Sequence, residues 1–162
     1  MLQFSPYLLQ RLVSAPGQAG AAFKPMLTLD QLKDTVAADL QALLNTRRGL
    51  HADDLQGFPQ LRRSVLAFGL DDFSSRSMAN TEDQAFICDA IAKTSAVHEP
   101  RLRDVQVELR RRDASTQRLR FLIRARLMVH PMSEPVNFDA VLQTGQTYAV
   151  TQAGRLQEAG GA

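Results

Sequence analysis

The sequence predicts an α+β fold in which N-terminal helices pack on a three- to four-stranded antiparallel sheet. Before Pro100 the apolar residues recur at helical spacing, and after it they alternate with polar residues at a period of two. Helices followed by strands are typical of α+β proteins. The 162 residues suit one domain with a core of its own. We expect that domain over 28–150, after a short helix and flexible connector (1–27) and before a loose tail (151–162).

The first long helix is expected over residues 29–46. Thr28 and Gln31 have the spacing of a capping box, in which each side chain bonds the other residue's backbone N–H. The apolar residues of this segment fall on one helical face: Leu29, Leu32, Val36, Leu40, Leu43 and Leu44. This face predicts a helix that covers one side of the sheet.

A second long helix is expected over 81–97, with Asn80 or Thr81 as its cap. Its inner face is expected to hold Ile87, Ala90, Ile91 and Thr94. Glu99 precedes Pro100, which disfavours helical angles at Glu99, so the helix ends there. Between the two long helices, Pro59 opens a short helix through "QLRRSVLAF", which Gly69 ends.

The strand-rich half contains three alternating segments, beginning near Val105, at Arg118 and at Val136. The stretches "RDAST" and "HPMSEP" are the turns between them, and "TGQTYAV" is the candidate for a short fourth strand. Such a meander has one apolar face and one polar face. The polar face is rich in arginine: Arg118, Arg120, Arg124 and Arg126.

Charge is unevenly distributed, although the net charge of the chain is only +2. Residues 28–99 hold seven basic and eleven acidic side chains, whereas 101–126 hold nine arginines and three acids. The planar guanidinium group of arginine donates two hydrogen bonds side by side, which matches carboxylate and phosphate groups on a partner. One interpretation is a contact face, with strand 118–129 at a sheet edge open to strand addition. The other is a central strand whose arginines are solvated.

Several classes of protein are disfavoured by the composition. No apolar run is long enough for a transmembrane helix, and we expect a cytoplasmic protein without membrane insertion. Cys88 is the single cysteine and lies among apolar residues, which indicates a buried, inert thiol. The sequence has no phosphate-binding glycine loop, and its three histidines are scattered, so we expect no cofactor and no metal site.

Glu99 allows three interpretations: a catalytic acid, half of an ion pair, or part of a docking surface. A muramidase-like enzyme would need a second carboxyl group, and Asp104 or Glu108 are the candidates. The arginines around Asp104 would lower its pKa, whereas a general acid needs a raised one. We therefore favour an ion pair between Glu99 and Arg101, and we expect no catalytic residues.

Nucleic-acid binding is a further alternative, because the arginine-rich strand offers phosphate contacts. However, the aromatic residues are not interleaved with these arginines in a stacking pattern. We therefore expect no nucleic-acid partner.

The ordered set "LLNTRR", "FPQLRRSVLAFGL" and "HEPRL", followed by "VQVEL", resembles the TssE family. These are the small baseplate subunits of type VI secretion systems, related to the phage-tail baseplate wedge proteins of the lysozyme-like family. The resemblance covers about residues 28–130. Glu99, Pro100 and Arg101 match the family's E-P-R triplet. Ala67 and Asp71 depart from it, because the family usually has asparagine and proline there.

The resemblance implies a non-enzymatic part of a contractile injection machine at the cytoplasmic face of the inner membrane. Its partners would be the wedge subunits TssF and TssG and the sheath subunits TssB and TssC. Asn45 and Arg47 match the family's helix-end motif. With the E-P-R triplet and the four arginines of strand 118–129, they complete the expected partner-binding set.

Overall fold

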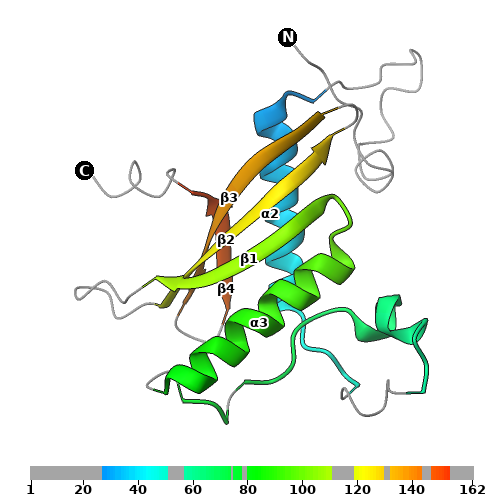
Figure 1. Cartoon of the computed structure of the whole chain (residues 1–162), viewed down its shortest axis with the longest axis vertical. Coiled ribbons are helices and arrows are strands. Elements are labelled where there is room, and N and C mark those ends of the chain that lie inside the picture. The colour runs from blue at the N-terminus through cyan, green and yellow to red at the C-terminus, as the bar shows by residue number, and fades with distance from the viewer. Residues whose placement is uncertain are drawn as a thin grey trace, which may run out of the picture.

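The fold consists of two long helices and one four-stranded antiparallel sheet, which confirms the predicted α+β class. The computed structural model describes residues 27–50, 57–73, 75–77, 80–110, 119–129, 132–143 and 147–153. The expected N-terminal helix, Arg118 and most of the expected tail lie outside these residues. The helices are α2 (Leu29–Asn45) and α3 (Thr81–His98), and Figure 1 shows both in relation to the sheet.

The strands form a simple meander in the order β1-β2-β3-β4. They are β1 (Leu102–Arg110), β2 (Leu119–Val129), β3 (Met132–Leu142) and β4 (Tyr148–Gln152). All neighbours pair antiparallel. β2 is therefore a central strand, paired on both sides, and the alternative that placed it at a sheet edge is wrong.

Local signals fix both helix starts. The Thr28 N–H donates to Gln31 Oε1 over 2.9 Å and the Gln31 N–H donates to Thr28 Oγ1 over 3.2 Å, which confirms the capping box. At α3, Asn80 is the cap, and its side-chain oxygen accepts from the Glu82 N–H over 3.0 Å. The start of each helix is thus set within three residues of sequence.

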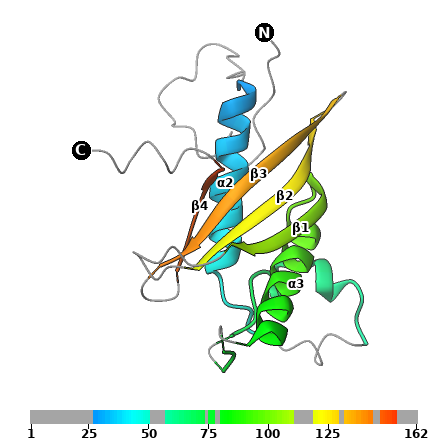
Figure 2. The ribbon, with the colours of Figure 1, turned by 60° about the vertical axis from the view of Figure 1, so that its left-hand side comes forward.

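The core lies between the helices and one face of the sheet. Phe121, Ile123, Leu127 and Phe138 point into it from β2 and β3 and have essentially no exposed surface. Leu32, Val36, Leu40, Leu43 and Leu44 of α2 meet them from the other side. Figure 2 shows α2 running alongside the sheet next to β3 and β4, while α3 packs along β1. The opposite face of the sheet, called here the outer face, carries the arginines.

Three local predictions were wrong in detail. The short helix after Pro59 is instead two 3-10 turns, η2 (Leu61–Arg63) and η3 (Val65–Ala67). β3 begins at Met132, so most of the expected turn "HPMSEP" pairs with β2. On α3, the fully buried residues are Ile87, Ile91 and Ser95, whereas Ala90 and Thr94 are only partly buried.

Candidate functional site

The junction between α3 and β1 is formed by the triplet Glu99, Pro100 and Arg101. The Glu99 N–H closes the last turn of α3 by donating to the Ser95 carbonyl over 2.9 Å. Pro100 follows and cannot continue the helical hydrogen bonding. The Arg101 carbonyl then accepts from the Met128 N–H over 2.8 Å, so the chain joins the sheet at once. No linker therefore separates the end of the helix from the first residue that bonds to the sheet.

Inside this junction, Glu99 and Arg101 form a buried ion pair with two points of contact. Arg101 Nε donates to Glu99 Oε1 over 2.5 Å, and Arg101 Nη2 donates to Glu99 Oε2. The Arg101 backbone N–H also donates to Glu99 Oε1, over 3.3 Å. Both residues are less than a tenth exposed. A bidentate contact of this kind restricts the orientation of the guanidinium and the carboxylate more than a single hydrogen bond does.

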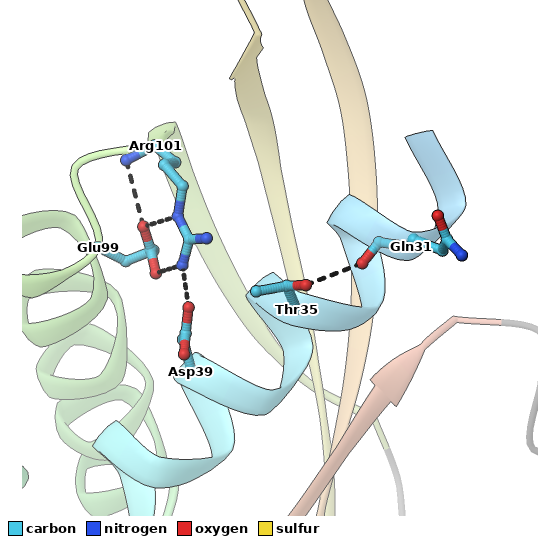
Figure 3. Close-up of polar contacts among 5 residues, drawn as sticks. All are labelled: Gln31, Thr35, Asp39, Glu99 and Arg101. Carbon is cyan, nitrogen blue, oxygen red and sulfur yellow. Dashed lines mark hydrogen bonds and ion pairs between the residues drawn. The ribbon is translucent and has the colours of Figure 1, made fainter. Parts of the chain in front are cut away.

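A third residue completes this group, since Arg101 Nη2 also donates to Asp39 Oδ2 on α2. Figure 3 shows the guanidinium of Arg101 between the two carboxylates. Asp39 comes from the side of α2 that also carries Thr35, whose hydroxyl donates to the Gln31 carbonyl over 2.9 Å. We call Asp39, Glu99 and Arg101 the junction triad. It ties α2, α3 and β1 together at one point.

The triad keeps Arg101 charged. Burial alone would lower the pKa of Arg101, but hydrogen bonds and charge from Glu99, and then from Asp39, raise it above its ordinary value. Sequence reasoning favoured the Glu99–Arg101 pair over a catalytic Glu99. It missed Asp39, which lies 62 residues from Arg101 in the chain.

The arrangement does not form the acid pair of a muramidase. Glu99 is buried and both of its oxygens accept from Arg101, whereas Glu108 lies on the outer face, where its Oε1 accepts from Arg124 Nη1 over 2.9 Å. Asp104 has a positive φ of 53° in a β-bulge near the start of β1. In the described part of the chain, no three His, Cys, Asp or Glu side chains gather as a metal site.

Asn45 has an internal role at the end of α2. Its Nδ2 donates to the Tyr148 carbonyl over 2.9 Å, and its Oδ1 accepts from the Tyr148 N–H over 2.7 Å. One turn earlier, Gln41 Oε1 accepts from the Val150 N–H over 3.0 Å. The side-chain amides of α2 thereby occupy backbone groups of β4. Arg47 is exposed just beyond the helix.

Two motifs of the sequence are joined by backbone pairing. The Leu70 N–H donates to the Thr46 carbonyl over 2.9 Å, and the Arg48 N–H donates to the Leu70 carbonyl over 2.8 Å. Gly69 permits this contact, because its φ is 111° and an added Cβ would lie 2.4 Å from the Thr46 oxygen. Asp71, where proline was expected, forms an ion pair with Arg48.

The arginines of β2 do lie on the outer face, as the alternation predicted. Arg120, Arg124 and Arg126 are exposed, and their sequence neighbours Phe121, Ile123, Ala125 and Leu127 are buried. In exposure they differ from Glu99 and Arg101 of the junction triad, which are buried. Leu122 on the same face is buried, in keeping with long arginine stems that can cover apolar surface.

Arginines from β1 meet those of β2 across the strands. Arg103 is directly opposite Arg126, and Arg110 is directly opposite Arg120. Like charges in these positions repel and destabilise a sheet. The outer face therefore carries unfavourable contacts between like charges.

Two titratable groups of α3 favour their neutral forms. Burial raises the pKa of the Cys88 thiol, which is half-buried, not fully buried as the sequence indicated. Burial likewise lowers the pKa of His98, although a hydrogen bond with the Ala67 backbone opposes it. The His98 ring makes an edge contact with Phe68, with centroids 5.4 Å apart. Neither group is placed as a nucleophile or a general base.

Comparison with known proteins agrees with this architecture. In the described part of the chain, no helix is both long and apolar enough to cross a membrane. A search of curated proteins returns no match. The family model of the baseplate wedge protein gp25 matches residues 30–132, which include both long helices, the junction triad and the first two strands. The chain belongs to the family of the baseplate wedge protein gp25.

Proposed function

We propose that this protein is the TssE-type baseplate subunit of a type VI secretion machine, that it links the baseplate wedge to the contractile sheath, and that it is not an enzyme. The family match supports a structural baseplate component. The observation that carries the rest is the junction triad. It binds the strongest candidate for a catalytic acid, Glu99, to Arg101 and makes the helix–sheet junction rigid. A pre-formed surface loses less entropy when it binds.

The wedge contact is assigned to the exposed rim of this junction, with TssF and TssG as the partners. Pro100 is exposed between the buried Glu99 and Arg101, and Arg47 is exposed beyond the end of α2. In this proposal Asn45 acts by holding β4 in place, since both polar atoms of its amide contact Tyr148. The triad then sets the position of the surface without forming it.

The sheath contact, with TssB and TssC, is assigned to the outer face and to the edge of β1 that no described strand pairs with, next to which α3 packs. The repelling pairs Arg103–Arg126 and Arg110–Arg120 favour an acidic partner there. α2 occupies backbone groups of β4, whereas β1 pairs with β2 alone among the described strands. Strand addition therefore fits β1 better than β4. This proposal also places the protein at the cytoplasmic face of the inner membrane.

Co-purification tests the proposal directly. The tagged chain is co-expressed with TssF and TssG, and a stable complex is the expected result. Failure to form the complex with a folded protein would contradict the wedge assignment. Incubation of the purified chain with peptidoglycan tests the enzyme alternative: turnover that disappears in a folded Glu99→Gln variant would establish a muramidase. Nucleic-acid binding remains the other alternative, and tight, salt-sensitive binding of DNA would support it.

A further inference from the structure

α3 carries apolar residues on two of its faces. Ile87 and Ile91 are fully buried against the sheet side, whereas Phe86 and Val97 are 44% and 41% exposed on another side. Ala90 lies between them and is half-buried. A helix that is apolar on more than one side is typical of burial between two layers. On the other side the described chain gives Phe86 only partial cover: Phe73 makes an edge contact with it, with ring centroids 6.2 Å apart, and the Arg76 guanidinium lies 4.0 Å from the centroid of the Phe86 ring.

The second apolar face borders a groove of about 510 Å³, called here the α3 groove. α3 forms one wall with Phe86, Ala90, Thr94 and Val97, and the other wall includes Arg48 and Arg62. Arg62 belongs to the segment 57–67 with its two 3-10 turns, called here the 3-10 lobe, which Figure 1 shows beside α3.

Exposed apolar residues are concentrated around this groove. Seven large apolar side chains are exposed in the described part of the chain, and five of them belong to the 3-10 lobe or α3. On the lobe, Phe58 is 61%, Val65 83% and Leu66 56% exposed. Concentrated apolar surface marks interaction sites more often than scattered residues do. The 3-10 lobe and α3 therefore hold most of the exposed large apolar side chains, and Phe86 and Val97 among them line the groove.

Charge indicates the kind of partner. Residues 57–70 contain Arg62 and Arg63 and no carboxylate. The groove lining has three cations, Arg48, Arg62 and Lys93, and two acids, Asp71 and Asp89, so its net charge is positive. A positive rim around an apolar surface favours a partner with acidic residues beside its apolar ones.

The length of the apolar stripe indicates the shape of the occupant. Phe86 to Val97 cover about three helical turns, or roughly 17 Å. A helix of similar length fits along such a stripe, in the helix-in-groove mode of recognition. The chain's first 29 residues contain no acid, and a second copy would bring the same positive rim. Neither the N-terminal residues nor a second copy therefore supplies the acidic residues that the positive rim of the groove favours.

We propose that the α3 groove receives an amphipathic helix of another protein chain, with its apolar side on Phe86 and Val97 and its acidic residues near Arg62 and Arg63. The proposal rests on the proposed function only in that the other chain would be a baseplate subunit. The surface is separate from the outer face of the sheet.

Two synthetic peptides of about 16 residues test this proposal, each long enough to span the stripe. Both carry the same leucine stripe, and the flanking residues are glutamate in one and lysine in the other. Fluorescence anisotropy measures their binding to the full chain. We expect the acidic peptide to bind at least about tenfold more tightly, and Val97→Glu or Leu66→Glu to weaken it by about as much. Met132→Glu, also at an exposed apolar residue, is the matched control and should have no effect.

Equal affinity for the two peptides, or unchanged binding in the Val97 variant, would overturn the proposal. So would a concentration-dependent dimer that Val97→Glu abolishes, because the occupant would then be a second copy. Co-purification with TssF and TssG is measured in parallel. If the wedge complex does not form but the acidic peptide binds, only the proposed function is refuted. If the wedge complex forms but the acidic peptide does not bind, only the proposal for the α3 groove is refuted.

Discussion

Arg101 reaches back two residues to Glu99 and, with the same Nη2 atom, across to Asp39 on α2. One guanidinium therefore connects the end of α3, the start of β1 and the middle of α2. Because both Glu99 and Arg101 are buried, the contribution of this group to stability depends strongly on which member is removed.

Truncating Arg101 should be the most damaging change in the triad. Arg101→Ala leaves Glu99 buried without its cation, at a cost of about 3–5 kcal/mol in the free energy of unfolding. Glu99→Ala should cost less, because Asp39 still pairs with Arg101. Asp39→Ala should cost about 1 kcal/mol or less, since the Asp39 side chain is 54% exposed. Urea denaturation gives the three values. Three equal costs would contradict this account of the triad.

The same variants separate folding from docking. We expect Glu99→Ala and Arg101→Ala to impair assembly with TssF and TssG, because the junction is no longer fixed. A melting curve for each variant shows whether lost binding follows from lost folding. Glu134→Ala removes a surface ion pair with Lys33, away from the α3 groove, and is the matched control. Unimpaired assembly in both triad variants would exclude a role of the triad in docking.

Arg126→Glu should leave the fold intact while weakening the sheath contact. Arg126 is directly opposite Arg103, so a carboxylate there replaces a repulsive pair with an attractive one. Stability should stay equal or rise by roughly 0.2–1 kcal/mol. Arg124→Glu is the comparison, because it places a carboxylate beside Glu108, the present partner of Arg124. Sheath polymerisation from assembled baseplates is the readout, and normal polymerisation with Arg126→Glu would exclude the outer face as the docking surface.

Gly69→Ala should destabilise the protein by at least about 2 kcal/mol. The φ of 111° is unfavourable for a residue with a Cβ, and that Cβ would lie 2.4 Å from the Thr46 carbonyl oxygen. Gly49→Ala is the control, since a Cβ at Gly49 has nothing within 4 Å. Thermal denaturation compares the two. If both variants melt alike, the Thr46–Leu70 contact is less restrictive than its geometry indicates.

His98 should make stability fall in mild acid. Burial lowers the pKa of His98 below its ordinary 6.5, so the unfolded chain takes up its proton at a higher pH than the folded one. The stability from neutral His98 is present above about pH 6.5 and is lost as pH falls through the lowered pKa. The His98→Gln variant has no titrating group at this position. The difference in the free energy of unfolding between the wild type and this variant should therefore shrink as the pH falls from about 7.5 to about 5. A stability difference that stays constant with pH would show that His98 is not responsible for the loss of stability in acid.

Local contacts were predictable from the sequence and distant ones were not. The capping box and the Glu99–Arg101 pair join residues two or three apart, so spacing alone indicates them. Asp39 and the Asn45–Tyr148 contact depend on segments 62 and 103 residues apart, which only the tertiary fold brings together.

The inner face of α3 was partly misassigned for a different reason. Apolar residues occur on more than one side of this helix, so periodicity does not single out the face that meets the sheet. The turn before β3 was placed too far along the chain because Pro135 argues against a strand. Pro135 nevertheless pairs in register with Arg126.

The amides of Gln41 and Asn45 bond the backbone of β4 as a neighbouring strand would. Sheets with two open edges can join one another in either direction, which is a route to fibres. Here α2 acts as a cap on the β4 edge, so growth by strand pairing is blocked at that end of the sheet.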